Sequence, residues 1–181
     1  YLGIADHSQT AVYANGLPPA KVKKQLGEIQ ELNREMAPFV VFAGIESDIL
    51  MDGRLDYDDE LLAAFDYVCA SVHGQFTGSE AQMTKRIVTA VSNPFTTMLG
   101  HPTGRLLLSR DGYPLNLTEV FAACAAHNVW IEINAHPVRL DLDWRHVKTA
   151  KEMGVKFVVN PDAHHTSEIA YFHYGVGVAR K

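Results

Sequence analysis

The sequence has 181 residues, of which 47% are hydrophobic and 20% are charged, an ordinary composition for a globular protein. A chain of this length suits one domain, which buries roughly 70% of the surface that the unfolded chain would expose. The formal net charge of −5 excludes the basic surface of a domain that binds nucleic acid by itself. We therefore expect a single domain over residues 1–181.

Two cysteines, Cys69 and Cys124, lie in apolar stretches of the sequence. They are too few for a disulfide framework, so we expect buried thiols in a reducing cytoplasm. No apolar run approaches the length of a membrane span and no signal peptide is recognisable, which predicts a cytoplasmic chain with no membrane partner. The chain begins at Tyr1, without an initiator Met and inside a strand-like pattern, so we expect a piece of a longer protein.

Apolar runs rich in β-branched and aromatic residues alternate with segments of helical periodicity. The runs have the length and composition of strands buried on both faces of a parallel sheet. They lie at Tyr1–Ala5, Phe39–Ile45, Phe65–Val72, Phe95–Leu99, Val129–Ile133 and Val155–Val159. The helical segments are Pro18–Met36, Tyr57–Ala64, Ser79–Val91, Leu117–Ala126 and Leu142–Met153. Ser79 and Gln82 resemble a capping box, and Gly154 suits the end of the last helix.

This alternation of strands and helices predicts an α/β fold, either a barrel or a doubly wound sheet. No glycine-rich dinucleotide fingerprint follows any of the expected strands, which disfavours the doubly wound sheet.

Residues that bind metals stand at the end of each expected strand. In a parallel barrel the carboxyl ends of the strands meet at one rim, where active sites are built. Imidazole and carboxylate together suit Zn, Mn or Fe. A single histidine at a strand end is more often structural, but the repetition favours a polynuclear metal site. The candidate ligands are His7, Glu46, His73, His101, Asp162 and His164. His136 and His165 neighbour the expected rim, and the sequence leaves open whether they contact metal.

Two further residues are candidates for catalytic roles. Arg105 follows the fourth expected strand on a short loop, from which its planar guanidinium could bind a substrate phosphate. Asp6 precedes His7, the first candidate ligand. It is a candidate to orient a metal ligand by a hydrogen bond, without binding the metal itself. For Lys85 and Arg86, in the helix after the third strand, an exposed helical face is at least as good an interpretation as function.

Six motifs resemble the polymerase and histidinol phosphatase (PHP) domain. They are Asp6-His7-Ser8, Gly44-X-Glu46, Ser71-Val72-His73, Gly100-His101-Pro102-Thr103-Gly104-Arg105-Leu106, Glu132-Ile133-Asn134 and Asp162-Ala163-His164. Three other stretches resemble most the C-terminal PHP domain of bacterial family X DNA polymerases: Tyr57–Asp66, Met83–Arg86 and Tyr174–Gly177. The resemblance implies a distorted, TIM-like (β/α)7 barrel. The family's opening His-X-His strand would precede Tyr1, so this chain is expected to lack the first strand.

The resemblance also implies divalent metal ions (Mn²⁺, Zn²⁺ or Fe), with up to three in an intact domain. Glu46 would bridge two ions, Asp162 would bind one of them, and His73 and His101 the other. His7 and His164 would share the third. In the polymerase branch the domain is a Mn-dependent 3′–5′ exonuclease that acts on DNA 3′ ends, with polymerase domains upstream in the same chain. Without the opening His pair, residues 1–181 alone are expected to be a poor or inactive hydrolase.

Two alternatives remain open. One is a phosphatase of the same superfamily that acts on a small phosphomonoester such as histidinol phosphate, which the acidic net charge mildly favours. The other is a non-catalytic scaffold that positions polymerase domains. A scaffold would be expected to lose rim ligands, whereas all six candidate ligands are present here.

Overall fold

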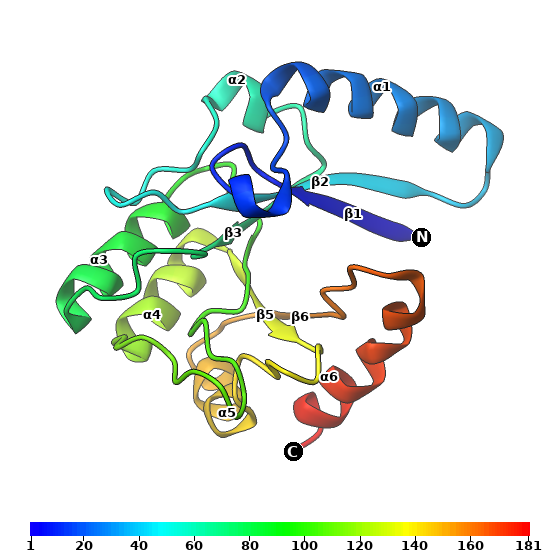
Figure 1. Cartoon of the computed structure of the whole chain (residues 1–181). Coiled ribbons are helices and arrows are strands. Elements are labelled where there is room, and N and C mark those ends of the chain that lie inside the picture. The colour runs from blue at the N-terminus through cyan, green and yellow to red at the C-terminus, as the bar shows by residue number, and fades with distance from the viewer.

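A computed structural model describes residues 1–181 and contains one curled sheet of six parallel strands (Figure 1). The strands are β1 (Leu2–His7), β2 (Val41–Asp48), β3 (Tyr67–Ser71), β4 (Met98–Leu99), β5 (Trp130–Asn134) and β6 (Phe157–Asn160). They pair in chain order, so β1 and β6 form the two ends of the sheet. This confirms the predicted α/β fold, a distorted (β/α)7 barrel that lacks one strand.

Helices connect the strands, as the alternation predicted (Figure 1). They are α1 (Pro19–Glu35), α2 (Asp59–Leu62), α3 (Glu80–Val91), α4 (Leu117–His127), α5 (Trp144–Glu152) and α6 (Phe172–Ala179). Two 3-10 turns, η1 (Val12–Ala14) and η2 (Thr166–Tyr171), follow β1 and β6. The sequence pattern did not predict η1, η2 or α6, and the second expected helix is only one turn long. None of the helices combines the length and apolar character that crossing a membrane requires.

The ends of two helices follow the predicted capping chemistry. Ser79 accepts a hydrogen bond from the amide of Gln82 at 3.3 Å, and the Gln82 side chain accepts one from the amide of Ser79 at 2.9 Å. Gly154 ends α5 with φ +90°, a conformation that side-chain-bearing residues rarely adopt. Its amide donates a 2.9 Å hydrogen bond to the carbonyl of Lys151. Both helix boundaries were therefore readable from the sequence.

Helix α6 escaped prediction because it contains two glycines, which are poor helix formers. Gly175 is needed for packing rather than for a turn. A Cβ atom at Gly175 would lie 2.5 Å from Cγ1 of Val159 and 2.7 Å from Cβ of Ala135. The absent side chain lets the helix backbone approach the ends of β5 and β6.

The hydrophobic core lies between the sheet and the helices that cover it. Ile45, Leu99 and Ile131 from three strands are fully buried, and Phe121 of α4 packs in the same cluster. Burial of this apolar surface fixes the strands, and with them the side chains that follow at their carboxyl ends. Cys69 and Cys124 are buried and unbonded to each other, as expected.

Candidate metal centre at the strand ends

Strand register brings the first candidate ligands together. The pairing of β1 with β2 sets His7 opposite Glu46. His73 follows the end of β3 by two residues, and His101 follows the end of β4 by two residues. Because all the strands are parallel, these positions lie at the same rim of the sheet.

Glu46 is the centre of the cluster. Its Oε1 lies 3.0 Å from Nε2 of His101 and 3.1 Å from Nε2 of His73, and its Oε2 lies 3.3 Å from Nδ1 of His7. Burial by itself would raise the pKa of Glu46, but the adjacent His101 and His73 imidazoles outweigh it and hold the pKa well below its ordinary value. The carboxylate is therefore ionised inside a largely buried site.

The imidazoles carry nitrogen atoms that the protein leaves without hydrogen-bond partners. Nδ1 of His7, Nε2 of His73 and Nδ1 of His101 are all buried and unpaired. For His7 and His73 the unpaired nitrogen faces Glu46 at close range but without the angles of a hydrogen bond. Ligand atoms of these two histidines and Glu46 all lie within 4.8 Å of one another. Buried orphan nitrogens next to an ionised carboxylate fit a divalent metal ion.

Asp162 and His164 approach the cluster from the loop after β6. Asp162 has φ +52°, which turns the chain there, and its Oδ2 accepts a 2.9 Å hydrogen bond from the side chain of Asn134. His164 remains mostly exposed, and its ring centroid lies 6.0 Å from that of His7. Burial lowers the pKa of His7, which favours the neutral imidazole that metals bind.

All six predicted ligands line one cavity of about 110 Å³. Two further side chains complete its wall: Tyr13 from η1 and Arg139 from the loop after β5. Nε of Arg139 lies 3.4 Å from Oδ2 of Asp162. The cavity therefore combines imidazoles, carboxylates, one guanidinium and one phenol.

Asp48 supports the cluster from behind. Its Oδ1 lies 2.5 Å from Nδ1 of His73, and its Oδ2 accepts a 2.8 Å hydrogen bond from the hydroxyl of Thr10. Burial opposes charge on His73, but Asp48 and Glu46 outweigh it and raise its pKa to about 9. Sequence reasoning missed Asp48, although its place two residues after Glu46 on one strand puts both side chains on the same face.

A second layer of polar groups lies beneath His101. The buried carboxylate of Glu132 accepts a 2.7 Å hydrogen bond from the amide of His101 and a 2.9 Å hydrogen bond from the side chain of Asn160. Burial raises the pKa of Glu132 to about 7. This layer fixes the backbone at His101, which has φ +24°.

The structure does not bring Asp6 to the cluster. Neighbouring residues on a strand point to opposite faces, so a His7 that faces the cavity turns Asp6 away from it. Oδ2 of Asp6 instead accepts a 2.5 Å hydrogen bond from the side chain of Gln25 on α1. The carboxylate that orients a candidate ligand is Asp48.

Arg105 also lies outside the cavity. Its Nε donates a 2.9 Å hydrogen bond to the carbonyl of Arg139, and its other nitrogens donate to the carbonyl of Leu140 and the carboxylate of Asp143. These partners occupy the guanidinium fork that was expected to bind substrate phosphate. The arginine beside the candidate ligands is Arg139.

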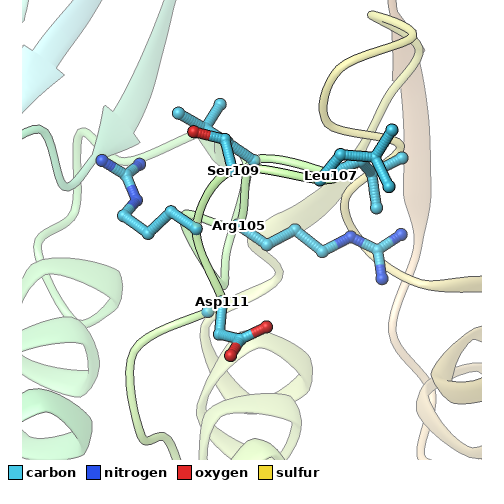
Figure 2. Close-up of a pocket in the computed structure, with 8 residues that line it drawn as sticks. Arg105, Leu107, Ser109 and Asp111 are labelled. Atoms are coloured by element: carbon cyan, nitrogen blue, oxygen red, sulfur yellow. The ribbon is translucent and has the colours of Figure 1, made fainter.

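The loop that contains Arg105 encloses a separate hollow of about 470 Å³ (Figure 2). All eight lining residues belong to this loop, from Arg105 to Gly112. Residues 105–112 include no histidine or cysteine, and their one carboxylate is Asp111. The hollow therefore lacks the chemistry of the smaller cavity and is not part of the site.

The remaining candidates have structural roles. Nδ1 of His136 accepts a hydrogen bond from the amide of Val138, and His165 caps η2. Neither residue lines the cavity. Lys85 is exposed as expected, but Arg86 is buried and donates hydrogen bonds to main-chain carbonyls of the loops after β2 and β3.

Comparison with known proteins identifies relatives in sequence and in fold. No protein-family model matches the sequence. The whole chain is 42% identical to the DNA polymerase/3′-5′ exonuclease PolX of Bacillus subtilis (strain 168), and it spans 32% of that protein's length. Over 91% of the chain it is 28% identical to a probable phosphatase of Thermoanaerobacter sp. (strain X514), of which it covers 69%.

Among solved structures, the crystal structure of histidinol phosphate phosphatase from Lactococcus lactis subsp. lactis Il1403, complexed with Zn, L-histidinol and phosphate, superposes with a TM-score of 0.57. It matches 91% of this chain and 74% of its own, at 14% sequence identity, and so shows a common fold.

These relatives are phosphatases and a polymerase with 3′-5′ exonuclease activity, which are phosphoester hydrolases, and the strand-end cluster has the ligand types of a divalent-metal site. The chain resembles these proteins in sequence and fold, which is consistent with the predicted polymerase and histidinol phosphatase (PHP) domain. It corresponds to the C-terminal part of the PolX polymerase, which extends well beyond the region matched here.

Proposed function

We propose that residues 1–181 form the 3′–5′ exonuclease and phosphodiesterase domain of a family X DNA polymerase that acts in DNA repair. Its substrates are DNA 3′ ends, which polymerase domains upstream in the same chain would deliver. The cluster around Glu46 carries this proposal, because it has the ligand chemistry of a hydrolytic metal site. The 42% identity to PolX over the whole chain supports the polymerase branch. The two buried thiols agree with a cytoplasmic location.

Six residues would hold the metal ions: His7, Glu46, His73, His101, Asp162 and His164. A bound divalent ion lowers the pKa of water to about 7 and polarises the phosphoryl oxygens. The mixture of imidazole and carboxylate suits Mn²⁺, Zn²⁺ or Fe, and up to three ions are proposed for an intact domain. The zinc bound in the structurally similar histidinol phosphate phosphatase supports this choice of ions.

Residues around the ligands have separate tasks. Asp48 fixes the ring of His73 through Nδ1, so that Nε2 faces the cavity. Arg139 lies in the cavity wall, where its guanidinium can bind non-bridging phosphate oxygens through two donors. We propose Arg139 for the role that the sequence suggested for Arg105, and Arg105 as the residue that positions it.

A small-molecule phosphatase is the second candidate function. The cavity of about 110 Å³ and the net charge of −5 favour a compact phosphomonoester over a long nucleic acid. Several of the relatives are probable phosphatases, which supports the same reaction class. A scaffold without catalysis is less compatible with a cavity that retains six ligand-type side chains.

One experiment separates these functions. The full natural protein is incubated with Mn²⁺ and either an oligonucleotide labelled at its 5′ end or histidinol phosphate. We expect stepwise shortening of the oligonucleotide from its 3′ end, abolished by a chelator and by Glu46→Gln, which keeps the side-chain size but removes the charge. Release of phosphate from histidinol phosphate alone would establish the phosphatase. No hydrolysis of either substrate would favour the scaffold.

A further inference from the structure

Tyr13 presents an aromatic ring at the mouth of the candidate metal centre. It lies on η1, the short turn between β1 and α1 in Figure 1. The residue is 69% exposed, yet it lines the cavity together with the candidate ligands. Its ring centroid lies 6.0 Å from that of His7 and 6.3 Å from that of His73, both in edge-on orientations. Much of the ring is therefore open to a ligand that enters the site.

The turn that carries Tyr13 is tightly built. The amide of Ala11 donates a 3.0 Å hydrogen bond to the carbonyl of Ser8, and Ala11 is fully buried. A Cβ atom at Gly16 would lie 1.9 Å from the carbonyl oxygen of Ser8, so the two ends of the turn touch. Asn15 closes η1 in the left-handed conformation.

Thr10 links this turn to the support of the metal centre. Its amide donates a 2.8 Å hydrogen bond to Oδ2 of Asp56, and its hydroxyl oxygen lies 3.0 Å from the same carboxylate oxygen. The hydroxyl also lies 2.8 Å from Oδ2 of Asp48, the residue that holds His73. The backbone turn that carries Tyr13 is thus fixed relative to the cluster, which reduces the backbone entropy lost when a ligand packs against the ring.

The ring is suited to packing rather than to acid–base chemistry. Partial burial and the nearby carboxylates of Asp48 and Glu46 raise the pKa of Tyr13 to about 12. The phenol therefore stays neutral at physiological pH. A protein of net charge −5 gains little affinity from the phosphate backbone of a nucleic acid. Stacking on an aromatic ring supplies affinity that does not depend on charge, and every nucleobase can provide the partner face.

We propose that Tyr13 is a substrate-contacting residue that stacks against the nucleobase next to the phosphate held at the strand-end cluster. The contact selects nucleic-acid ends over small aliphatic phosphomonoesters, which offer no flat ring. This inference rests on the proposed exonuclease function. It explains how the site would recognise nucleic-acid ends.

The test compares Tyr13→Leu and Tyr13→Phe in the full natural protein with Mn²⁺. The substrates are an oligonucleotide, the same oligonucleotide with an abasic 3′-terminal sugar, and glycerol phosphate. Stacking is worth about 1–3 kcal/mol per base, so Tyr13→Leu should raise the KM for the normal oligonucleotide roughly 5- to 150-fold. Tyr13→Phe retains the ring and should behave like the wild type. The KM values for the abasic end and for glycerol phosphate should not change.

A binding measurement provides a readout that does not need hydrolysis. Fluorescence anisotropy of the labelled oligonucleotide in the presence of a chelator should show the same weakening with Tyr13→Leu and none with Tyr13→Phe. Val12→Ala is the matched control, because Val12 is 80% exposed on the same turn but does not line the cavity.

Unchanged oligonucleotide KM and Kd in Tyr13→Leu would overturn the inference while leaving the exonuclease function intact. An equal rise in KM for the normal and the abasic oligonucleotide would also overturn the inference. The ring would then support the structure of the site and would not bind a base. A wild type that hydrolyses only glycerol phosphate would reject the exonuclease function and this inference together. If the wild type hydrolyses nothing, the proposed function fails, and the anisotropy comparison decides the inference separately.

Discussion

The guanidinium of Arg105 donates a 2.9 Å hydrogen bond to the main-chain carbonyl of Arg139, whose own guanidinium lies 3.4 Å from Asp162. One arginine therefore holds the backbone of a second arginine that faces the candidate metal centre. Arg105 is 19% exposed at its side chain and pairs with Asp143, so it belongs to the framework of the site. Substitutions of the two arginines should therefore have different effects, on catalysis for Arg139 and on stability for Arg105.

Replacing Arg139 should impair catalysis without removing metal. Arg139→Gln removes a charged donor from the cavity wall, and hydrogen bonds to charged groups contribute about 1.5–3 kcal/mol. We expect kcat/KM of the full protein to fall about 10- to 100-fold, with metal content per chain unchanged. Steady-state kinetics and metal analysis provide the measurement, with the exposed Lys148→Gln on α5 as control. Loss of metal in parallel with activity would instead make Arg139 a residue that holds Asp162 in place.

Replacing Arg105 should primarily lower stability. Arg105→Met leaves the carbonyls of Arg139 and Leu140 without their donor and removes one partner of Asp143. We expect the free energy of unfolding to fall by about 2 kcal/mol, measured by chemical denaturation. Arg145→Met is the matched control, because Arg145 pairs with the same carboxylate but is exposed, and it should change stability little. Equal effects of both substitutions would contradict a framework role for Arg105.

The stabilisation by the Asp143 ion pairs should depend on pH. Arg145 and then Arg105 hold the pKa of Asp143 below its ordinary value, although partial burial opposes them. A carboxyl whose folded pKa is depressed contributes stability above its unfolded pKa of about 3.9, and loses it as the pH falls toward the folded value. The part of the stability difference between wild type and Arg105→Met that comes from the Arg105–Asp143 pair should be constant from pH 5 to 8. It should shrink below about pH 4. A difference that grows on acidification would contradict this assignment.

Asp48→Asn should weaken metal binding at the cluster. The substitution keeps the shape of the side chain but removes the charge that orients Nδ1 of His73. Loss of such a supporting carboxylate typically lowers metal affinity about 10- to 100-fold. Competition between the apoprotein and a chelator for Zn²⁺ measures this change. Asp52→Asn is the control, because Asp52 pairs with Arg54 in the exposed loop after β2. Identical affinities for both variants and the wild type would exclude the supporting role of Asp48.

The two thiols should be unreactive in the folded protein. Cys124 is fully buried and Cys69 is 7% exposed. Burial raises the pKa of Cys124 to about 12, and that of Cys69 lies well above its ordinary value. A disulfide reagent at pH 8 should therefore modify neither thiol in the native protein and both in denaturant. Rapid modification of the native protein would show that the sheet opens readily near β3 or α4.

The sequence alone determined the fold class and six of the eight residues that line the cavity. The apolar runs identify six strands, and their alternation with helices dictates parallel pairing. Since parallel strands end at one rim, side chains as distant in sequence as His7 and His164 were expected to meet, and they line one cavity. Their identity as metal ligands stays a prediction.

Only the tertiary structure decided where the neighbouring side chains point. Asp6 and His7 are adjacent in sequence, but the pleat of β1 sends them to opposite faces. No local pattern marks Tyr13 or Arg139, because each reaches the cavity from a connecting segment whose course depends on distant contacts. For Arg105, the carbonyls that capture its guanidinium lie more than thirty residues further along the chain. A long charged side chain follows the acceptors that packing brings within reach, and those acceptors exist only after the chain has folded.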